Sequence, residues 1–78
     1  MKINMNNAFA RKFDMFELVY NTKKNKLQMV IAEVPMNKRA ECGMPKMKRC
    51  YICSEPKERA WEFELAENLR PATIFERV

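Results

Sequence analysis

Histidine is absent from this chain of 78 residues, and glycine occurs only once. Without an imidazole, the chain lacks the side chain that most often serves as a general base near neutral pH. Glu62 and Glu64 resemble a catalytic carboxylate pair, but we expect both on the exposed face of a strand, where nothing separates their pKa values. No serine, cysteine or lysine has an identifiable activating neighbour. The sequence therefore predicts a protein that is not an enzyme and has no catalytic residues.

Cysteine is present, but too sparsely for a complete metal site. The three thiols follow a C-x7-C-x2-C pattern at Cys42, Cys50 and Cys53. A structural zinc ion takes four protein ligands, so this set is one short unless Glu41, Glu55 or a second subunit supplies the fourth. A redox pair is disfavoured, because the residues inside C-x2-C are typical of a strand and not of a helix N-terminus. We expect no metal and no cofactor, with the thiols acting mainly as small buried apolar groups.

Long apolar runs are also missing. No stretch approaches the roughly 20 apolar residues that cross a bilayer, and residues 1–7 contain no apolar core of a secretory signal. We therefore expect no membrane association. An odd number of cysteines cannot close a disulfide framework, so a reducing compartment, the cytoplasm, is the expected location. The length allows one compact domain over residues 1–78, which buries roughly 60–65% of the surface that the unfolded chain exposes.

Charge is plentiful and unevenly distributed. The formal net charge is +5. Residues 1–49 hold 11 Lys and Arg against four Asp and Glu, whereas residues 50–78 hold four against six. The first two thirds of the chain are therefore expected to attract anionic partners, while the last third presents a mildly acidic surface.

The spacing of apolar residues predicts one helix followed by an antiparallel hairpin. Four apolar residues share a helical stripe because they recur at spacings of four, four and three: Met5, Phe9, Phe13 and Phe16. Residues 17–20 and 27–34 are rich in strand-forming residues. The polar, lysine-bearing loop between them is typical of a hairpin.

Beyond Pro35 the pattern weakens. Residues 36–49 follow neither the helical nor the strand period, and they contain the glycine and a second proline. We predict that they form a basic loop. Residues 71–78 fit an edge strand and a short helix equally well.

A second pair of strands is predicted after this loop, at 49–53 and 59–66. The second of these has residues of high helical propensity, but Trp61, Phe63 and Leu65 alternate strictly with glutamates. In a strand these three side chains share one face, whereas a helix places the two rings about 200° apart. We therefore predict a strand with Trp61 and Phe63 both buried against the core.

These elements predict an α+β fold, a single small domain in which an N-terminal helix packs on a small antiparallel sheet. The predicted core draws on apolar residues from all of the elements: Phe9, Phe13, Phe16, Leu18, Val30, Ile52, Trp61, Phe63 and Leu65. A core of this size leaves no room for a deep active-site cleft.

Three groups of cations and several loop methionines are the candidate binding residues. The predicted partner-binding set combines the hairpin tip with the basic loop: Lys23, Lys24, Lys26, Lys38, Arg39, Met44, Lys46, Met47, Lys48 and Arg49. Met36, Met44 and Met47 lie on no periodic face, and polar loops seldom carry apolar side chains that never become buried. The plain alternative is a solvated cationic surface that only keeps the protein soluble.

We therefore expect a small, non-enzymatic, basic binding protein that occupies the surface of a larger protein or nucleoprotein complex, as a regulator or inhibitor does. The alternative is direct binding to DNA or RNA through the hairpin tip and the loop, with Tyr20, Tyr51 or Trp61 stacking on bases. The sequence motifs of common nucleic-acid-binding modules are absent. Compact, methionine-rich domains of this size suggest a phage or mobile-element accessory protein. The sequence identifies neither the partner nor the oligomeric state.

Overall fold

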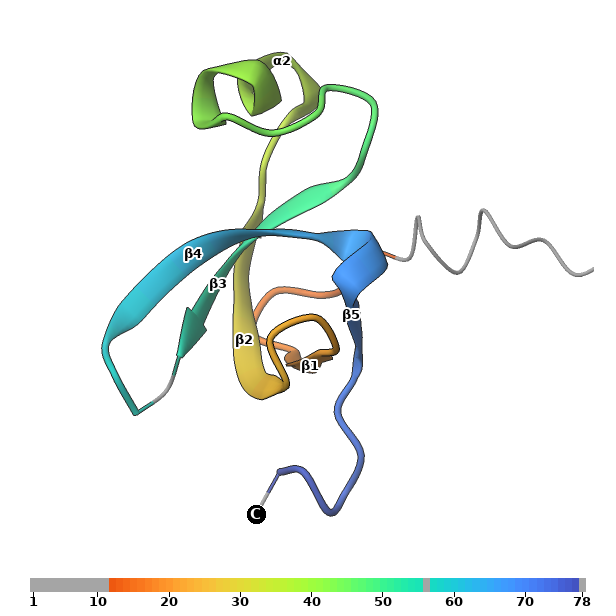
Figure 1. Cartoon of the computed structure of the whole chain (residues 1–78), viewed down its shortest axis with the longest axis vertical. Coiled ribbons are helices and arrows are strands. Elements are labelled where there is room, and N and C mark those ends of the chain that lie inside the picture. The colour runs from red at the N-terminus through yellow and green to blue at the C-terminus, as the bar shows by residue number, and fades with distance from the viewer. Residues whose placement is uncertain (1–11, 56, 78) are drawn as a thin grey trace, which may run out of the picture.

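A five-stranded antiparallel sheet organises the chain in a computed structural model that describes residues 12–55 and 57–77 (Figure 1). The elements follow in the order β1 (Leu18–Asn21), β2 (Lys26–Glu33), α2 (Met36–Arg39), the 3-10 turn η1 (Ala40–Cys42), β3 (Cys50–Glu55), β4 (Ala60–Leu65), the 3-10 turn η2 (Ala66–Asn68) and β5 (Leu69–Pro71). No helix in the described ranges is long and apolar enough to cross a membrane.

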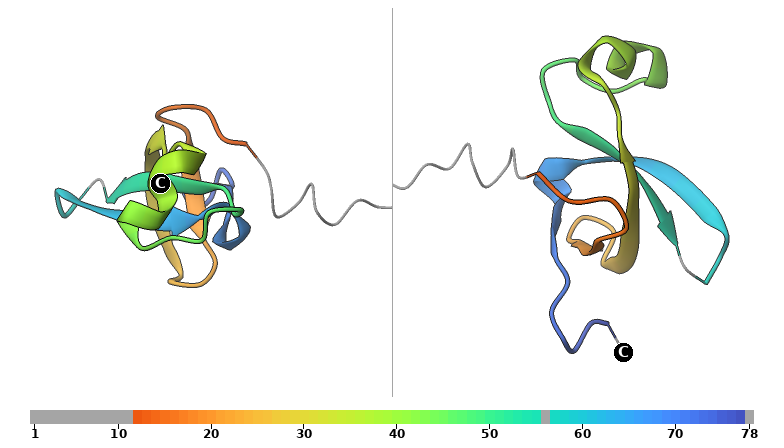
Figure 2. Two further views of the ribbon diagram at one scale, coloured as in Figure 1. Left: turned by 90° about the horizontal axis from the view of Figure 1, so that it is seen from above. Right: turned by 180° about the vertical axis from the view of Figure 1, so that it is seen from behind.

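The five strands are arranged in the order β4-β3-β2-β1-β5. Strands β1 to β4 form a meander, in which each strand pairs with its predecessor in the chain. The sheet is strongly curved, with the β3–β4 hairpin on one side of β2 and β5 on the other (Figure 2). The meander confirms the predicted hairpin and the predicted pair of later strands.

The last strand returns to the free edge of β1. Pro71 of β5 lies opposite Val19, and the Thr22 N–H donates to the Asn68 carbonyl at 2.8 Å next to this pairing. Proline suits this edge strand because it has no N–H to donate to a further neighbour. Residues 71–78, for which the sequence left an edge strand and a short helix open, contribute only Pro71 to this edge strand, and a turn follows.

The two hairpin tips have the same length and end on a residue of similar backbone conformation. Asn21 pairs with Lys26, and Glu55 pairs with Ala60, so each tip spans four residues. The residue before the second strand has a positive φ in both tips: 56° at Asn25 and 54° at Arg59. Asparagine tolerates this left-handed conformation, whereas a long side chain seldom adopts it.

The curved sheet has a buried inner face and a half-exposed outer face. The hydrophobic core combines inner strand residues with Phe13, which precedes β1, and Ala66 of η2; the strand residues are Val19, Val30, Tyr51, Cys53 and Leu69. The Tyr51 ring packs edge-on against Phe13 with centroids 5.6 Å apart, and its hydroxyl accepts a hydrogen bond from the Phe13 N–H at 2.8 Å. Strand β2 changes register between Val30 and Ala32, and such a bulge increases the bend of a strand. Phe13 and Val30 are buried as predicted.

The predicted strand at β4 is confirmed, but its predicted orientation was wrong. Trp61 is 60% exposed and Phe63 is half-exposed, because both lie on the outer face. The inner positions are Glu62 and Glu64, and Glu64 lies opposite the buried Tyr51. A strict alternation shows which residues share a face but not which face is buried. Three further predicted core residues are half-exposed: Leu18, Ile52 and Leu65.

The predicted place of the helix was also wrong. The described chain has its helical segment at 36–42, inside the predicted basic loop, and residues 12–17 are not helical. Pro35 precedes α2 and favours a helix start, since its fixed φ suits the first turn. Two residues of the predicted N-terminal stripe lie outside the described ranges: Met5 and Phe9.

A turn replaces the last part of the predicted helix. The Glu17 N–H donates to the Asp14 carbonyl at 3.1 Å, and Phe16 adopts a φ of 68°. The Phe16 N–H donates to the Val30 carbonyl at 2.6 Å, so this segment extends the pairing of β1 with β2. Phe16 is consequently exposed and not part of the core.

Candidate functional site

Residues 34–49 join β2 to β3 and project beyond one end of the sheet as a separate lobe (Figure 1). The lobe contains α2 and η1, and Gly43 ends η1 with a φ of 76°, a conformation that glycine adopts without strain. The Met44 N–H donates to the Arg39 carbonyl at 2.9 Å, and the Met44 side chain is half-buried. Most of the predicted partner-binding residues lie in this lobe.

Arg39 holds the lobe together from within. The residue is 6% exposed. Its Nε donates to the Val34 carbonyl at 3.1 Å, and its Nη1 donates to the Lys46 carbonyl at 3.0 Å. Its Nη2 lies 3.4 Å from Glu33 Oε2, which also accepts from Arg49 Nη1 at 3.0 Å. Arg39 and Arg49, both predicted to contact a partner, are therefore engaged in fixing the fold of the lobe.

The outer surface of the lobe carries apolar and cationic side chains. Met47 is 79% exposed and Met36 is 48% exposed. Lys46 is exposed and forms no ion pair with any described residue. Lys38 and Lys48 each lie near a glutamate, at 3.6 and 3.0 Å. Such exposed pairs contribute little stability, so these two cations remain accessible to an anionic partner.

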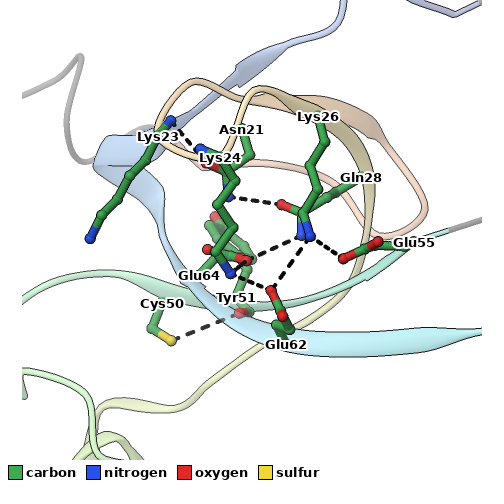
Figure 3. Close-up of polar contacts among 10 residues, drawn as sticks. All are labelled: Asn21, Lys23, Lys24, Lys26, Gln28, Cys50, Tyr51, Glu55, Glu62 and Glu64. Atoms are coloured by element: carbon green, nitrogen blue, oxygen red, sulfur yellow. Dashed lines mark hydrogen bonds and ion pairs between the residues drawn. The ribbon is translucent and has the colours of Figure 1, made fainter. Parts of the chain in front are cut away.

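Two lysines of the β1–β2 tip point toward carboxylates on the inner face of β3 and β4 (Figure 3). Lys24 Nζ lies 2.6 Å from Glu64 Oε2 and also pairs with Glu62. Burial disfavours the charged form of Lys24, but the hydrogen bonds from its amine to Glu62 and Glu64 outweigh this effect and raise its pKa. Lys26 pairs with Glu55, which raises the pKa of Lys26. The basic tip and the acidic strand therefore neutralise each other within the molecule.

A chain of buried amides extends this cluster into the core. Asn21 Nδ2 donates to Gln28 Oε1 at 3.0 Å, and Gln28 Nε2 donates to Glu64 Oε2 at 3.1 Å. Asn21 Oδ1 accepts from the N–H groups of Lys23 and Lys24. The sequence interpretation missed this network, although the two amides share the inner face with the apolar Val19 and Val30. Lys23, by contrast, is exposed and its side chain points away from the carboxylates (Figure 3).

The three cysteines do not converge on one site. Cys50 and Cys53 are three residues apart on β3, so they point to opposite faces of the sheet, and Cys42 ends η1. Burial raises the pKa of Cys53 to about 12 and also raises the pKa of Cys50. Both thiols therefore stay protonated at neutral pH, unlike the thiolate of a reactive pair. Within residues 12–55 and 57–77, no three Cys, His, Asp or Glu side chains are arranged to hold a metal ion.

An exposed aromatic pair occupies the outer face of β4. The Trp61 and Phe63 rings meet edge to face, with centroids 5.3 Å apart and planes at 86°. The residues opposite them on β3 are Ser54 and Ile52. Tyr51, which the sequence suggested as a stacking residue, is buried in the core instead.

Comparison with protein-family models, with curated proteins and with solved structures found no match to this chain. The lobe and the aromatic pair are the features from which a function can be proposed.

Proposed function

We propose that this protein is a non-enzymatic binding protein that occupies the surface of a larger protein or nucleoprotein through the lobe, as a regulator or inhibitor does. The observation that carries the proposal is the buried Arg39, which joins the start of the lobe at Val34 to its far side at Lys46. A connection fixed in this way is already ordered before it meets a partner. Less conformational entropy is lost on binding, so more of the contact energy appears as affinity.

The chemistry of the lobe surface supports a macromolecular partner. Met47 and Met36 are exposed apolar side chains on an otherwise polar connection. Methionine adapts its shape to a partner and supplies apolar contact area. Lys46, Lys38 and Lys48 add positive charge that speeds encounter with an acidic or phosphate-bearing surface.

Direct binding of nucleic acid through the β1–β2 tip has less support. Lys24 and Lys26 already pair with carboxylates of β3 and β4, so their charges are largely neutralised before any phosphate arrives. Lys23 alone among the three tip lysines is exposed without an ion pair to a described residue. One exposed cation supplies only a weak phosphate contact.

A capture experiment tests the proposal. The immobilised protein is compared with a lobe variant, Met36→Ala with Lys46→Glu and Met47→Ala. All three side chains are exposed, and the bond from Arg39 to position 46 is to the backbone carbonyl, which the substitution retains. A matched control carries Met15→Ala with Lys23→Glu, two exposed positions outside the lobe. The proposal predicts a partner that the wild type and the control retain and the lobe variant loses. Equal recovery of every captured protein by all three forms contradicts it.

A further inference from the structure

The outer face of β4 presents an indole that nothing in the described chain covers. Trp61 is 60% exposed, although tryptophan is among the most costly residues to leave in water. Its edge-to-face contact with Phe63 fixes the ring. The residue opposite it on β3 is the small Ser54, so one side of the indole stays open.

Positive charge predominates in the tip beside this ring, where two cations flank one carboxylate. All four carboxylates in the strands occupy inner positions: Glu33, Glu55, Glu62 and Glu64. The outer face of the five strands consequently carries no carboxylate. Lys57 and Arg59, in the adjoining β3–β4 tip, are exposed and pair with no described residue. The carboxylate between them, Glu58, is hydrogen-bonded to Glu55, and this contact raises its pKa.

Arg59 has an unusual backbone conformation for a long side chain. Arg59 has a φ of 54°, and Asn25 has a φ of 56° at the same place in the β1–β2 tip. This left-handed conformation favours glycine or asparagine, as the other tip illustrates. A long cationic side chain held in such a conformation contributes nothing to the turn itself, and strained positions of this kind are common at binding sites.

We infer that the outer face of β4, together with Lys57 and Arg59 just before it, binds single-stranded nucleic acid. A base stacks on the open face of Trp61, while Lys57 and Arg59 contact the phosphates on either side of it. A single strand is favoured over a duplex, because paired bases are already stacked on their neighbours. A nucleic acid is favoured over an acidic polypeptide, because the site pairs an open aromatic ring face with two cations. The inference does not depend on the lobe.

Trp61 is the only tryptophan of the chain and therefore reports directly on its own site. The experiment titrates the protein with oligothymidylate of about 12 nucleotides, within the range that one small domain covers, in about 50 mM salt. Stacking quenches the indole fluorescence. Oligouridylate of the same length is expected to bind equally well, since neither the stacking contact nor the phosphate contacts involve the 2′-hydroxyl. The matching duplex is expected to bind at least about tenfold more weakly.

Three variants, measured with a fluorescently labelled oligonucleotide, separate the two contacts. Trp61→Ala is expected to lower the affinity about 5- to 150-fold, the range that corresponds to loss of one stacked base, whereas Phe75→Ala, at another exposed ring, leaves it unchanged. Lys57→Gln combined with Arg59→Asn keeps a residue at position 59 that tolerates the turn. This variant should reduce the slope of log affinity against log salt by roughly 1.4, while Lys23→Gln leaves the slope as it is.

Several results overturn the inference. One is tight binding of the labelled oligonucleotide without quenching of Trp61, which places the contact elsewhere. Another is competition by polyglutamate. If polyglutamate quenches the Trp61 fluorescence and displaces the oligonucleotide at an equal concentration of charges, the face binds acidic polypeptides instead. The third is no binding at low salt by a wild-type protein that is folded by circular dichroism. The lobe variant described above should still show quenching, so a failure of the proposed function and a failure of this inference remain distinguishable.

Discussion

Lys24 Nζ lies 2.6 Å from Glu64 Oε2, although the two residues are 40 positions apart in the chain. The contact joins the tip of the first hairpin to the last strand of the meander. It involves Glu62 and Glu64 on the inner face of β4, whereas Trp61 and Phe63 lie on the outer one. The ion pair and the exposed aromatic pair therefore occupy opposite faces of the same strand.

The first prediction concerns this pair. Lys24→Ala should lower the free energy of unfolding by about 1–3 kcal/mol, because Glu64 then stays buried without its cation. Glu64→Gln should lower the free energy of unfolding less in the Lys24→Ala variant than in the wild type. The difference, which is the coupling energy between the two positions, should be at least about 1 kcal/mol. Urea denaturation of the wild type, both single variants and the double variant measures it. Lys23→Ala serves as the control and should change stability by less than about 0.5 kcal/mol. Strictly additive effects at Lys24 and Glu64 would show that the two side chains do not interact.

The second prediction compares the two faces of the sheet. Tyr51→Ala removes a buried ring and should cost about 3–5 kcal/mol of unfolding free energy. Trp61→Ala should cost less than about 1.5 kcal/mol, since the indole buries little surface on folding. Thermal or chemical unfolding of both variants provides the comparison. A Trp61→Ala variant that is as unstable as Tyr51→Ala would mean that the indole is part of the core.

Thiol reactivity gives the third prediction. Iodoacetamide at pH 8 should modify Cys42, which is partly exposed, in the folded protein. Cys53 should react only after denaturation, because burial both shields it and raises its pKa to about 12. Cys50, which is also buried and whose pKa is also raised, should behave in the same way. Mass spectrometry of digested samples assigns each modified site. Rapid labelling of Cys53 in the native state would contradict the burial described for β3.

The fourth prediction concerns pH. Hydrogen bonds from Arg70 and from the Thr73 N–H lower the pKa of Glu76 from its ordinary 4.5 to about 2. Because the pKa is lower in the folded state, the contribution of this pair to stability is complete above about pH 4.5 and is lost as the pH falls toward 2. Arg70→Ala should let the pKa of Glu76 rise toward its ordinary value in a carbon-detected NMR titration. Arg77→Ala, at an exposed neighbouring cation, should leave it where it is.

Local patterns of the sequence predicted the strands well. The hairpin expected at 17–20 and 27–34 appears as Leu18–Asn21 and Lys26–Glu33, and β4 lies within the expected 59–66. The buried face of β4 was not predictable from alternation, because it depends on where the β1–β2 tip comes to lie. A lysine in a distant turn decides whether a glutamate points inward, and no local period carries that information.

The exposure of several residues in the candidate site was predictable, but the structural roles of others were not. The segment 36–49 was expected to carry exposed methionines and cations, and Met47 and Lys46 are exposed there. Arg39, however, is a buried hydrogen-bond donor to the backbone of its own lobe. A sequence gives the charge of an arginine but not the carbonyl groups that converge on it after folding.

The central claim is that the lobe is the surface that binds a partner. Hydrogen exchange on a purified complex tests this claim most directly. Amide exchange is compared between the free protein and the protein bound to the partner identified by the capture experiment. The account predicts slower exchange on binding at residues 40–48, with the β1 amides of Leu18–Asn21 unchanged because they are already paired within the sheet. Unchanged exchange throughout the lobe, with new protection confined to another surface, would contradict it.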